Sequence, residues 1–228
     1  MTKTQQNNLQ KYFKWLDKKQ VERLQNAKIK EALNNNWWTY DRFKEVHKIK
    51  GIRFKNESIF NKMTDKEKIQ YIKEHLKLYY ENQFKQYKED IQSILNCEEE
   101  LHKIEINVKW SKSYTWGWNP HAEAFVNNKY VGYSSASGCG YCKRSTVYSH
   151  SLKSSKTFKK AVLLEVLKND ITKEENRKNL PYGVKIDDWG FSCNFAGCGV
   201  STFTSILQYI GFDYKNISDN ENYYIAFK

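Results

Sequence analysis

The sequence IEINVKW, residues 104–110, marks a change of pattern that decides the fold class. Apolar and polar residues alternate here, and a period of two places the apolar residues on one face of a β-strand. Strand-like segments follow at residues 122–126 and 130–133, and Asn127-Asn128 between them is typical of a hairpin turn. We therefore expect an antiparallel sheet that begins near residue 104.

The chain before this stretch has the composition of helices. Of the ten glycines, only Gly51 precedes residue 117, and glycine weakens a helix more than almost any other residue. The spacing of apolar residues predicts one helix over residues 5–33 and a second over residues 64–94. Thr64 and Glu67 form a capping-box pattern at the start of the second helix.

The rest of the chain continues the mixture of strands and helices. Residues 111–120 are expected to form a polar, aromatic loop between the first two strands. Further elements are predicted as helices at 143–153, 157–168 and 200–210, the last of them ended by Gly211, a strand at 190–195, and a terminal hairpin of strands 212–217 and 223–227. We infer an α+β fold, with a helical domain over residues 1–100 and, over residues 101–228, an antiparallel-sheet domain with three interleaved helices.

The 228-residue chain has a formal net charge of +12. Residues 1–100 carry 21 basic and 15 acidic side chains and residues 101–228 carry 17 and 11, so each half contributes +6. A positive field of this size favours polyanionic partners such as nucleic acid or an acidic protein surface. The alternative is that the many lysines reflect an AT-rich genome and the solubility of the protein.

The sequence also predicts a cytoplasmic protein. The N-terminus lacks the apolar segment of a secretory signal, and no run approaches the ~18 apolar residues that span a bilayer, so we expect no membrane association. The five cysteines are an odd number, which favours reduced thiols over a disulfide framework.

Residues 124–164 form an acid-free segment, which contains seven cations and no acidic residue. Lysines, arginines, hydroxyls and aromatic rings are the groups that contact phosphates and stack on bases. The segment predicts an interface for nucleic acid or a partner protein, unless its counter-charges come from elsewhere in the fold. The candidate residues are Lys129, Lys143, Arg144, Lys153, Lys156, Lys159, Lys160 and Tyr141, with Trp116 and Trp118 just upstream.

The cysteines raise two alternative functions. Cys139 and Cys142 form a C-x-x-C, and Cys139 is the centre of a hypothetical redox or cysteine-dependent enzyme, with His121 or His150 as base and Asp187 or Asp188 as orienting group. Two thiol pairs also permit a zinc-stabilised module, although the C-x4-C spacing of the second pair is unusual; the ligands would be Cys139, Cys142, Cys193 and Cys198. We predict no catalytic residue and no cofactor, since no motif supports either.

Two short runs resemble a domain of uncharacterised proteins from bacteriophages and mobile elements of low-GC Gram-positive bacteria. These are WGWNPHAEA at 116–124 and ASGCGY at 136–141, the latter followed by Lys143 and the pair Ser145-Thr146. The resemblance covers roughly residues 104–228, and in that domain an acidic residue commonly stands where this chain has Cys142. It implies an accessory protein that binds DNA or blocks a host defence such as a CRISPR nuclease. We therefore expect a non-enzymatic binding protein whose partner is nucleic acid or a host nucleoprotein complex.

Overall fold

The protein has an α+β fold, as predicted from the sequence. The chain forms two compact units, residues 13–89 (the helical unit) and residues 1–12 with 90–228 (the sheet unit). Compared with the boundary expected after residue 100, this division assigns residues 1–12 and 90–100 to the sheet unit. A computed structural model describes residues 1–35, 39–49, 52–113, 117–135, 152, 154–193, 200–216 and 222–227.

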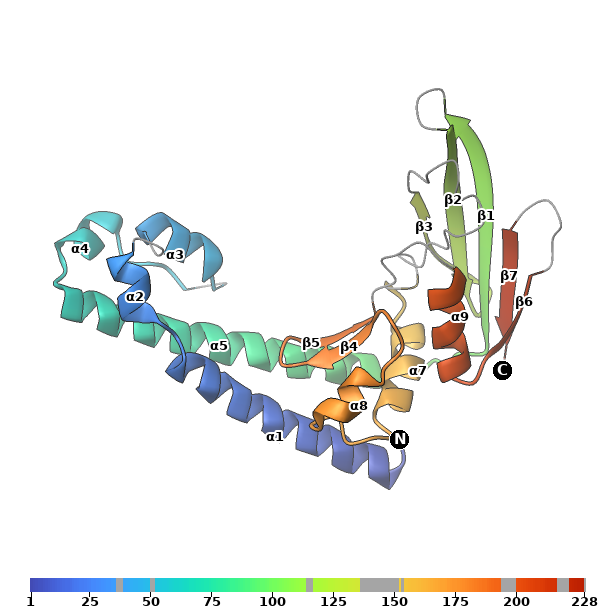
Figure 1. Ribbon diagram of the computed structural model, residues 1–228, viewed down its shortest axis with the longest axis horizontal. Coiled ribbons are helices and arrows are strands. Elements are labelled where there is room, and N and C mark those ends of the chain that lie inside the picture. The colour runs from blue at the N-terminus through green and yellow to red at the C-terminus, as the bar shows by residue number, and fades with distance from the viewer. Residues whose placement is uncertain are drawn as a thin grey trace. The chain divides into compact units, whose positions relative to one another are not determined.

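The helices of the N-terminal half are α1 (Lys3–Gln25), α2 (Ile29–Asn34), α3 (Tyr40–Val46), α4 (Glu57–Lys62) and α5 (Asp65–Leu95) (Figure 1). The prediction of one continuous helix over residues 5–33 is wrong. Lys28 has φ −77° and ψ 58°, outside the helical region, so the chain turns between α1 and α2. The turn brings Ile29 into the core, where it is 4% exposed, and its burial favours the break.

The start of α5 confirms the predicted capping box. The backbone N–H of Thr64 donates to Oε2 of Glu67 at 2.7 Å, and the N–H of Glu67 donates to Oγ1 of Thr64 at 3.4 Å. These bonds satisfy two of the donors that a helix N-terminus leaves without an intrahelical partner.

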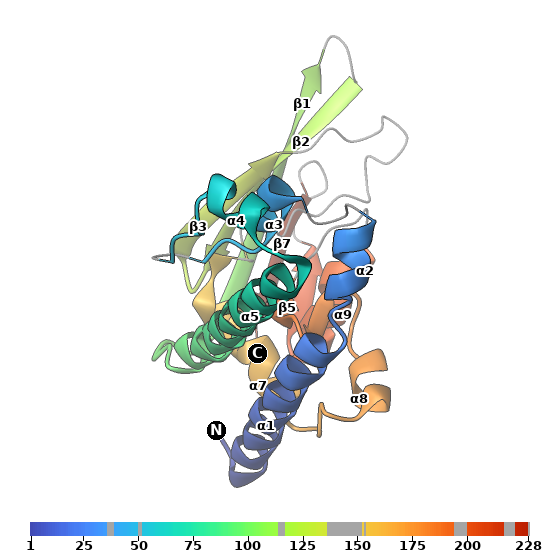
Figure 2. The same cartoon turned by 90° about the vertical axis from the view of Figure 1, so that its left-hand side faces the viewer.

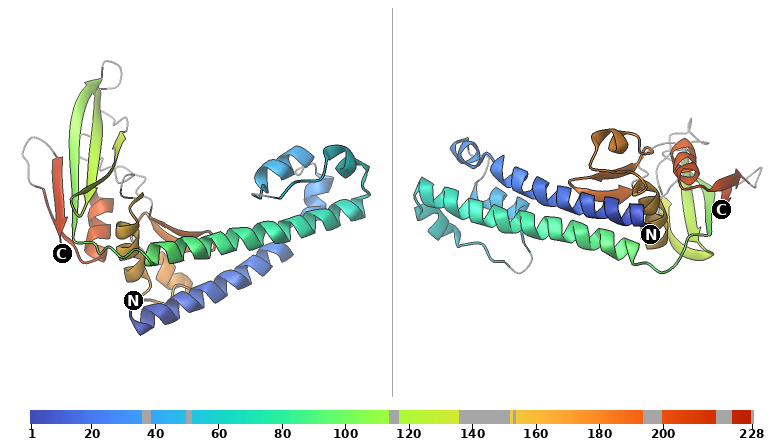
Figure 3. Two further views of the ribbon diagram at one scale, coloured as in Figure 1. Left: turned by 180° about the vertical axis from the view of Figure 1, so that it is seen from behind. Right: turned by 90° about the horizontal axis from the view of Figure 1, so that it is seen from below.

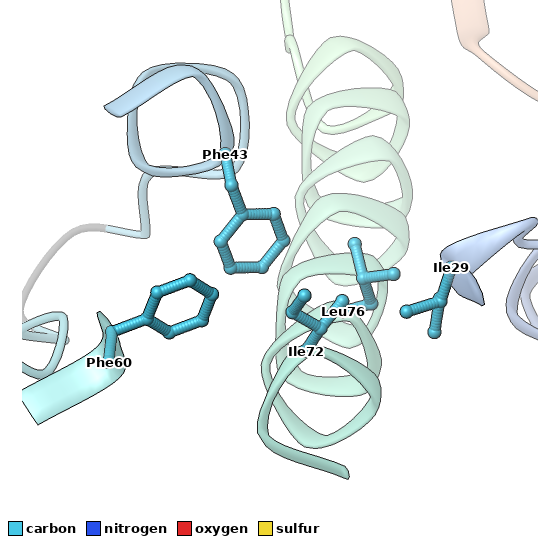
Figure 4. Close-up of a cluster of buried hydrophobic side chains, with 5 residues drawn as sticks. All are labelled: Ile29, Phe43, Phe60, Ile72 and Leu76. Carbon is cyan, nitrogen blue, oxygen red and sulfur yellow. The ribbon is translucent and has the colours of Figure 1, made fainter. Parts of the chain in front are cut away.

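The core of the helical unit forms around the N-terminal half of α5. Ile72 and Leu76 of α5 meet Ile29 on one side of the helix and Phe43 and Phe60 on the other (Figure 4). Helices α2, α3 and α4 have only six or seven residues each, too few to be stable alone in water. Each one buries a large apolar side chain against α5, which stabilises the unit by about 1.5–3 kcal/mol per side chain.

The sheet unit contains a five-stranded antiparallel sheet in the order β3-β2-β1-β7-β6 (Figure 1). Pairing of the first two strands runs from Ile104 opposite Val126 to Ser113 opposite Gly117, so the loop expected over residues 111–120 is wrong. The strands are β1 (Lys103–Ser113), β2 (Gly117–Val126), β3 (Lys129–Ser135), β6 (Asp213–Asn216) and β7 (Asn222–Phe227), and the last two confirm the predicted terminal hairpin.

Asn127 and Asn128 form the predicted turn between β2 and β3. Their φ angles are 51° and 65°, the left-handed values that a two-residue turn requires and that asparagine tolerates better than most residues. The register of the two strands then shifts between Ala124 and Phe125, opposite Gly132 with φ 139°. This bulge places an extra residue on β3, and glycine accommodates the local bend.

Three described helices and a small hairpin complete the sheet unit (Figure 3). Helix α9 contacts β6, and α7 contacts both α9 and β5. Gly211 ends α9 with φ 77°, as its position in the sequence indicated. The predicted helix over 143–153 lies outside the described residues except for Leu152, while α8 and β4 were not predicted. The elements are α7 (Lys156–Val166), α8 (Glu174–Lys178), β4 (Val184–Asp187), β5 (Gly190–Cys193) and α9 (Val200–Tyr209).

The first turns of α1 belong to the sheet unit because polar side chains attach them to it. Nε2 of Gln5 donates to the carbonyl of Leu164 at 2.7 Å, and Nδ2 of Asn8 donates to the carbonyl of Leu167 at 3.0 Å. Both carbonyls lie at the C-terminal end of α7, where carbonyls have no intrahelical partner. The hydroxyl of Tyr12 donates to the carbonyl of Asp187 in β4 at 2.6 Å. These bonds join residues 159 to 175 positions apart in sequence.

Candidate nucleic-acid and partner interface

Four of the predicted interface cations belong to the described residues. Lys129 begins β3, and Lys156, Lys159 and Lys160 lie on α7. Trp118 lies on β2. The other candidates lie outside the described residues: Trp116, Tyr141, Lys143, Arg144 and Lys153.

Two lysines of α7 bind the C-terminal end of α5. Nζ of Lys156 donates to Oγ of Ser93 at 2.8 Å, and Nζ of Lys160 donates to the carbonyl oxygen of Cys97. The last turn of α5 has no basic residue of its own, although the end of a 31-residue helix carries partial negative charge and unpaired carbonyls. Helix α7 therefore supplies the positive charge that this helix end lacks.

Lys129 pairs with Glu99, in the linker between α5 and β1. Oε1 of Glu99 accepts from Nδ2 of Asn127 and from Nζ of Lys129, both at 3.1 Å, and Oε2 accepts from Oγ1 of Thr157 at 3.2 Å. The bond from Asn127, followed by that from Lys129, holds the pKa of Glu99 below its usual range. Glu99 is therefore a counter-charge for the acid-free segment, supplied from outside it.

The structure thus brings Lys129, Lys156 and Lys160 together around residues 93–99. They have polar partners within the fold, which favours a structural role for these three cations. Lys129 nevertheless keeps 73% of its side chain exposed, so solvent and a polyanion can both reach its ammonium group.

Cys193 on β5 has the environment of a packed apolar residue. It is 1% exposed, and burial raises the pKa of its thiol to about 12, although Lys159 acts in the opposite direction. A thiol with this pKa stays protonated at neutral pH, which disfavours a nucleophilic role for Cys193. Cys139, Cys142 and Cys198 lie outside the described residues.

Asp187 is one of the other groups proposed for catalysis whose side chain the structure describes. Oδ1 of Asp187 accepts the backbone N–H of Trp189 at 2.8 Å, which assigns this carboxylate to the β4–β5 turn. His121 lies on β2, and His150 is outside the described residues. Among the residues that the structure describes, no three His, Cys, Asp or Glu side chains are grouped as a metal site requires.

The two compact units differ in net charge, although the halves on either side of residue 100 have equal net charge. Residues 13–89 carry 19 basic and 11 acidic side chains, a net charge of +8. Residues 1–12 and 90–228 carry 19 and 15, a net charge of +4 over almost twice the length. The helical unit is therefore the more strongly basic one, and sequence reasoning missed it because the unit boundaries lie inside two long helices.

No protein family, curated protein or solved structure matches the chain. The resemblance to a domain of phage and mobile-element proteins therefore stays a prediction. None of the helices in the described ranges is both long and apolar enough to cross a membrane.

Proposed function

We propose that this chain is a non-enzymatic binding protein that attaches to nucleic acid or to a host complex that handles nucleic acid. The observation that carries the proposal is the excess of positive charge, +12 in total, present in both compact units. Lysine and arginine release condensed counterions when they contact phosphates, and this term supplies most of the affinity of sequence-independent binding.

The sharpest form of the proposal is inhibition of a defence nuclease, such as a CRISPR nuclease, by a protein of a phage or mobile element. A chain of this charge does not imitate nucleic acid, which is negative. It would instead bind the nucleic acid that such a complex holds, or an acidic surface of the complex itself. The resemblance of residues 116–146 to phage and mobile-element proteins supports this context.

A mobility-shift titration tests the proposal with duplex DNA, single-stranded DNA and RNA at several salt concentrations. We expect binding that weakens as salt increases. The slope of log K against the logarithm of the salt concentration should decrease in magnitude by about one for each phosphate-contacting lysine that is lost. The informative variant is Lys143→Glu/Arg144→Glu, because Lys156 and Lys160 also hold the end of α5. Lys14→Glu/Lys62→Glu makes the same charge change at exposed positions of the helical unit, so comparison of the two variants shows which unit contacts the phosphates.

An affinity pull-down from host lysate, with and without nuclease treatment, separates the two kinds of partner. Loss of the captured proteins after nuclease treatment indicates attachment through nucleic acid, and retention indicates a protein surface. The proposal fails if no nucleic acid binds at low salt and charge reversal at Lys143 and Arg144 leaves partner binding intact.

A further inference from the structure

The helical unit contains a groove next to the break between α1 and α2. Its volume is about 700 Å³, within the ~300–1,000 Å³ typical of ligand pockets. The groove is open where the end of α1, α2 and the start of α5 meet, and Figure 2 shows α2 directly beyond the end of α1. Its lining consists of Leu24, Gln25, Ala27, Lys28, Ile29, Lys30, Glu31, Ile69 and Lys73.

The floor of the groove is aliphatic. Leu24, Ala27 and Ile69 are partly buried and pack against the core cluster around Ile72 and Leu76. Their remaining exposed surface is apolar, and covering it with a partner's aliphatic side chains would release water. The core cluster below supports this floor, so a ligand meets a preformed surface.

The rim of the groove is cationic. Lys28, Lys30 and Lys73 are exposed, and Glu31 is the single acidic residue of the lining. Nζ of Lys28 lies 3.1 Å from Oε2 of Glu31, so this acid already has a partner. Lys30 and Lys73 have no acidic partner among the described residues. The lining therefore carries a net charge of +2, from three lysines and one glutamate.

The composition of the lining distinguishes between two kinds of anionic partner. Nucleic-acid surfaces combine cations with aromatic rings for stacking and with hydroxyls for phosphates. The described lining contains no aromatic ring and no hydroxyl, and its only amide is Gln25. Aliphatic side chains beside lysines instead match a peptide that combines carboxylates with leucine-like anchors.

From these observations we propose that the groove binds an acidic segment of a partner protein, with aliphatic side chains on Leu24, Ala27 and Ile69 and carboxylates at Lys30 and Lys73. The site belongs to the helical unit and uses none of residues 124–164. It is therefore independent of the nucleic-acid interface proposed above.

Selection of a random peptide library, displayed on phage, against the full chain tests the site. We expect the enriched peptides to be acidic and to contain Leu, Ile, Val or Met. The affinity of a synthetic copy of the best peptide should fall about tenfold or more in Lys30→Glu/Lys73→Glu. It should change less than about twofold in the control Lys14→Glu/Lys62→Glu, which makes the same charge change elsewhere on the same unit.

A second variant tests the apolar floor without changing any lysine. Ala27→Asp introduces a carboxylate at the centre of the groove and should also weaken the peptide about tenfold, with an unchanged circular dichroism spectrum as evidence of folding. The proposal is overturned if no peptide is enriched, if the enriched peptides are neutral or basic, or if both groove variants bind as tightly as the control. If a DNA duplex displaces the peptide as effectively as unlabelled peptide does, the groove binds nucleic acid and the proposal is also overturned.

Discussion

Asn127 combines a backbone conformation with a set of hydrogen bonds that few other residues can supply. Its φ is 51°, and its Oδ1 accepts the backbone N–H groups of His102 at 2.8 Å and Lys103 at 3.1 Å. Its Nδ2 donates to Glu99 and to the carbonyl of Glu100. One side chain therefore joins the β2–β3 turn to the linker before β1.

Replacing Asn127 separates the contribution of its backbone conformation to stability from that of its hydrogen bonds. We expect Asn127→Ala to lower the free energy of unfolding by about 1–3 kcal/mol, because it loses the bonds and because alanine tolerates a left-handed φ less well than asparagine. Asn127→Gly should cost less, since glycine adopts this φ freely and only the bonds are lost. Urea unfolding followed by circular dichroism measures both, and equal losses would mean that the backbone conformation contributes nothing.

We expect His47 to make the stability of the helical unit depend on pH. The residue is 6% exposed, Nδ1 donates to the carbonyl of Phe43 at 3.1 Å, and the ring of Tyr79 packs edge-on against its ring. Nε2 of His75 donates to the backbone carbonyl of His47 at 2.7 Å. Burial lowers the pKa of His47; the bond to Phe43 opposes this shift and His75 adds to it. In the unfolded chain the group titrates near ~6.5. Between the two pKa values the unfolded state binds more protons than the folded state.

Stability should therefore be unaffected by His47 above about pH 6.5 and decrease as the pH falls below it, down to the pKa of the folded state. Unfolding by urea at several pH values between neutral and pH 5 measures this slope. His47→Phe keeps a ring in the core and removes the titrating group, so its slope should be smaller. An identical slope in both proteins would exclude His47 as the source.

At the scale of elements, the C-terminal end of α5 depends on a lysine of α7 for part of its stability. Lys160→Met keeps most of the apolar side chain but removes the ammonium group that binds the carbonyl of Cys97. We expect a loss of about 1 kcal/mol in the free energy of unfolding. Lys159→Met on the same helix is the control and should change it by less than about 0.5 kcal/mol. A larger effect at Lys159 than at Lys160 would contradict this role of Lys160.

The elements that could be predicted from the sequence have local signals. The capping box at Thr64, the turn at Asn127 and the glycine after α9 each act over a few residues, and all three occur where expected. The break at Lys28 and the length of the β1–β2 pairing depend on burial and on partner strands, which no local pattern contains. The same distinction holds for the candidate site: its cations are evident in the sequence, whereas the partners Ser93, Cys97 and Glu99 lie 30 to 63 residues from the lysines that bind them.

At the scale of the whole molecule, α1 and α5 each contribute to both compact units. The N-terminal turns of α1 complete the sheet unit through Gln5, Asn8 and Tyr12, and its remaining turns belong to the helical unit. The charge asymmetry follows from this division. The strongest positive field therefore belongs to residues 13–89, an insertion between two segments of the less basic unit.

The first residues of α1 should consequently affect the stability of the sheet unit. Asn8 is 6% exposed and bonds to Leu167, so Asn8→Ala should lower the free energy of unfolding by about 1–2 kcal/mol. The neighbouring Asn7 is exposed, and Asn7→Ala should change it by less than about 0.5 kcal/mol. Thermal unfolding of the two variants side by side measures the difference, and equal midpoints would contradict the attachment of α1 to α7.

The bond from Tyr12 to Asp187 has a further consequence during synthesis. A ribosome makes Tyr12 first and must add 175 more residues before its partner exists. The helical unit is complete in the nascent chain well before that point, since residues 13–89 form one continuous stretch of sequence. The N-terminal turns of α1 therefore lack these partners until residues 164–187 have left the ribosomal exit tunnel.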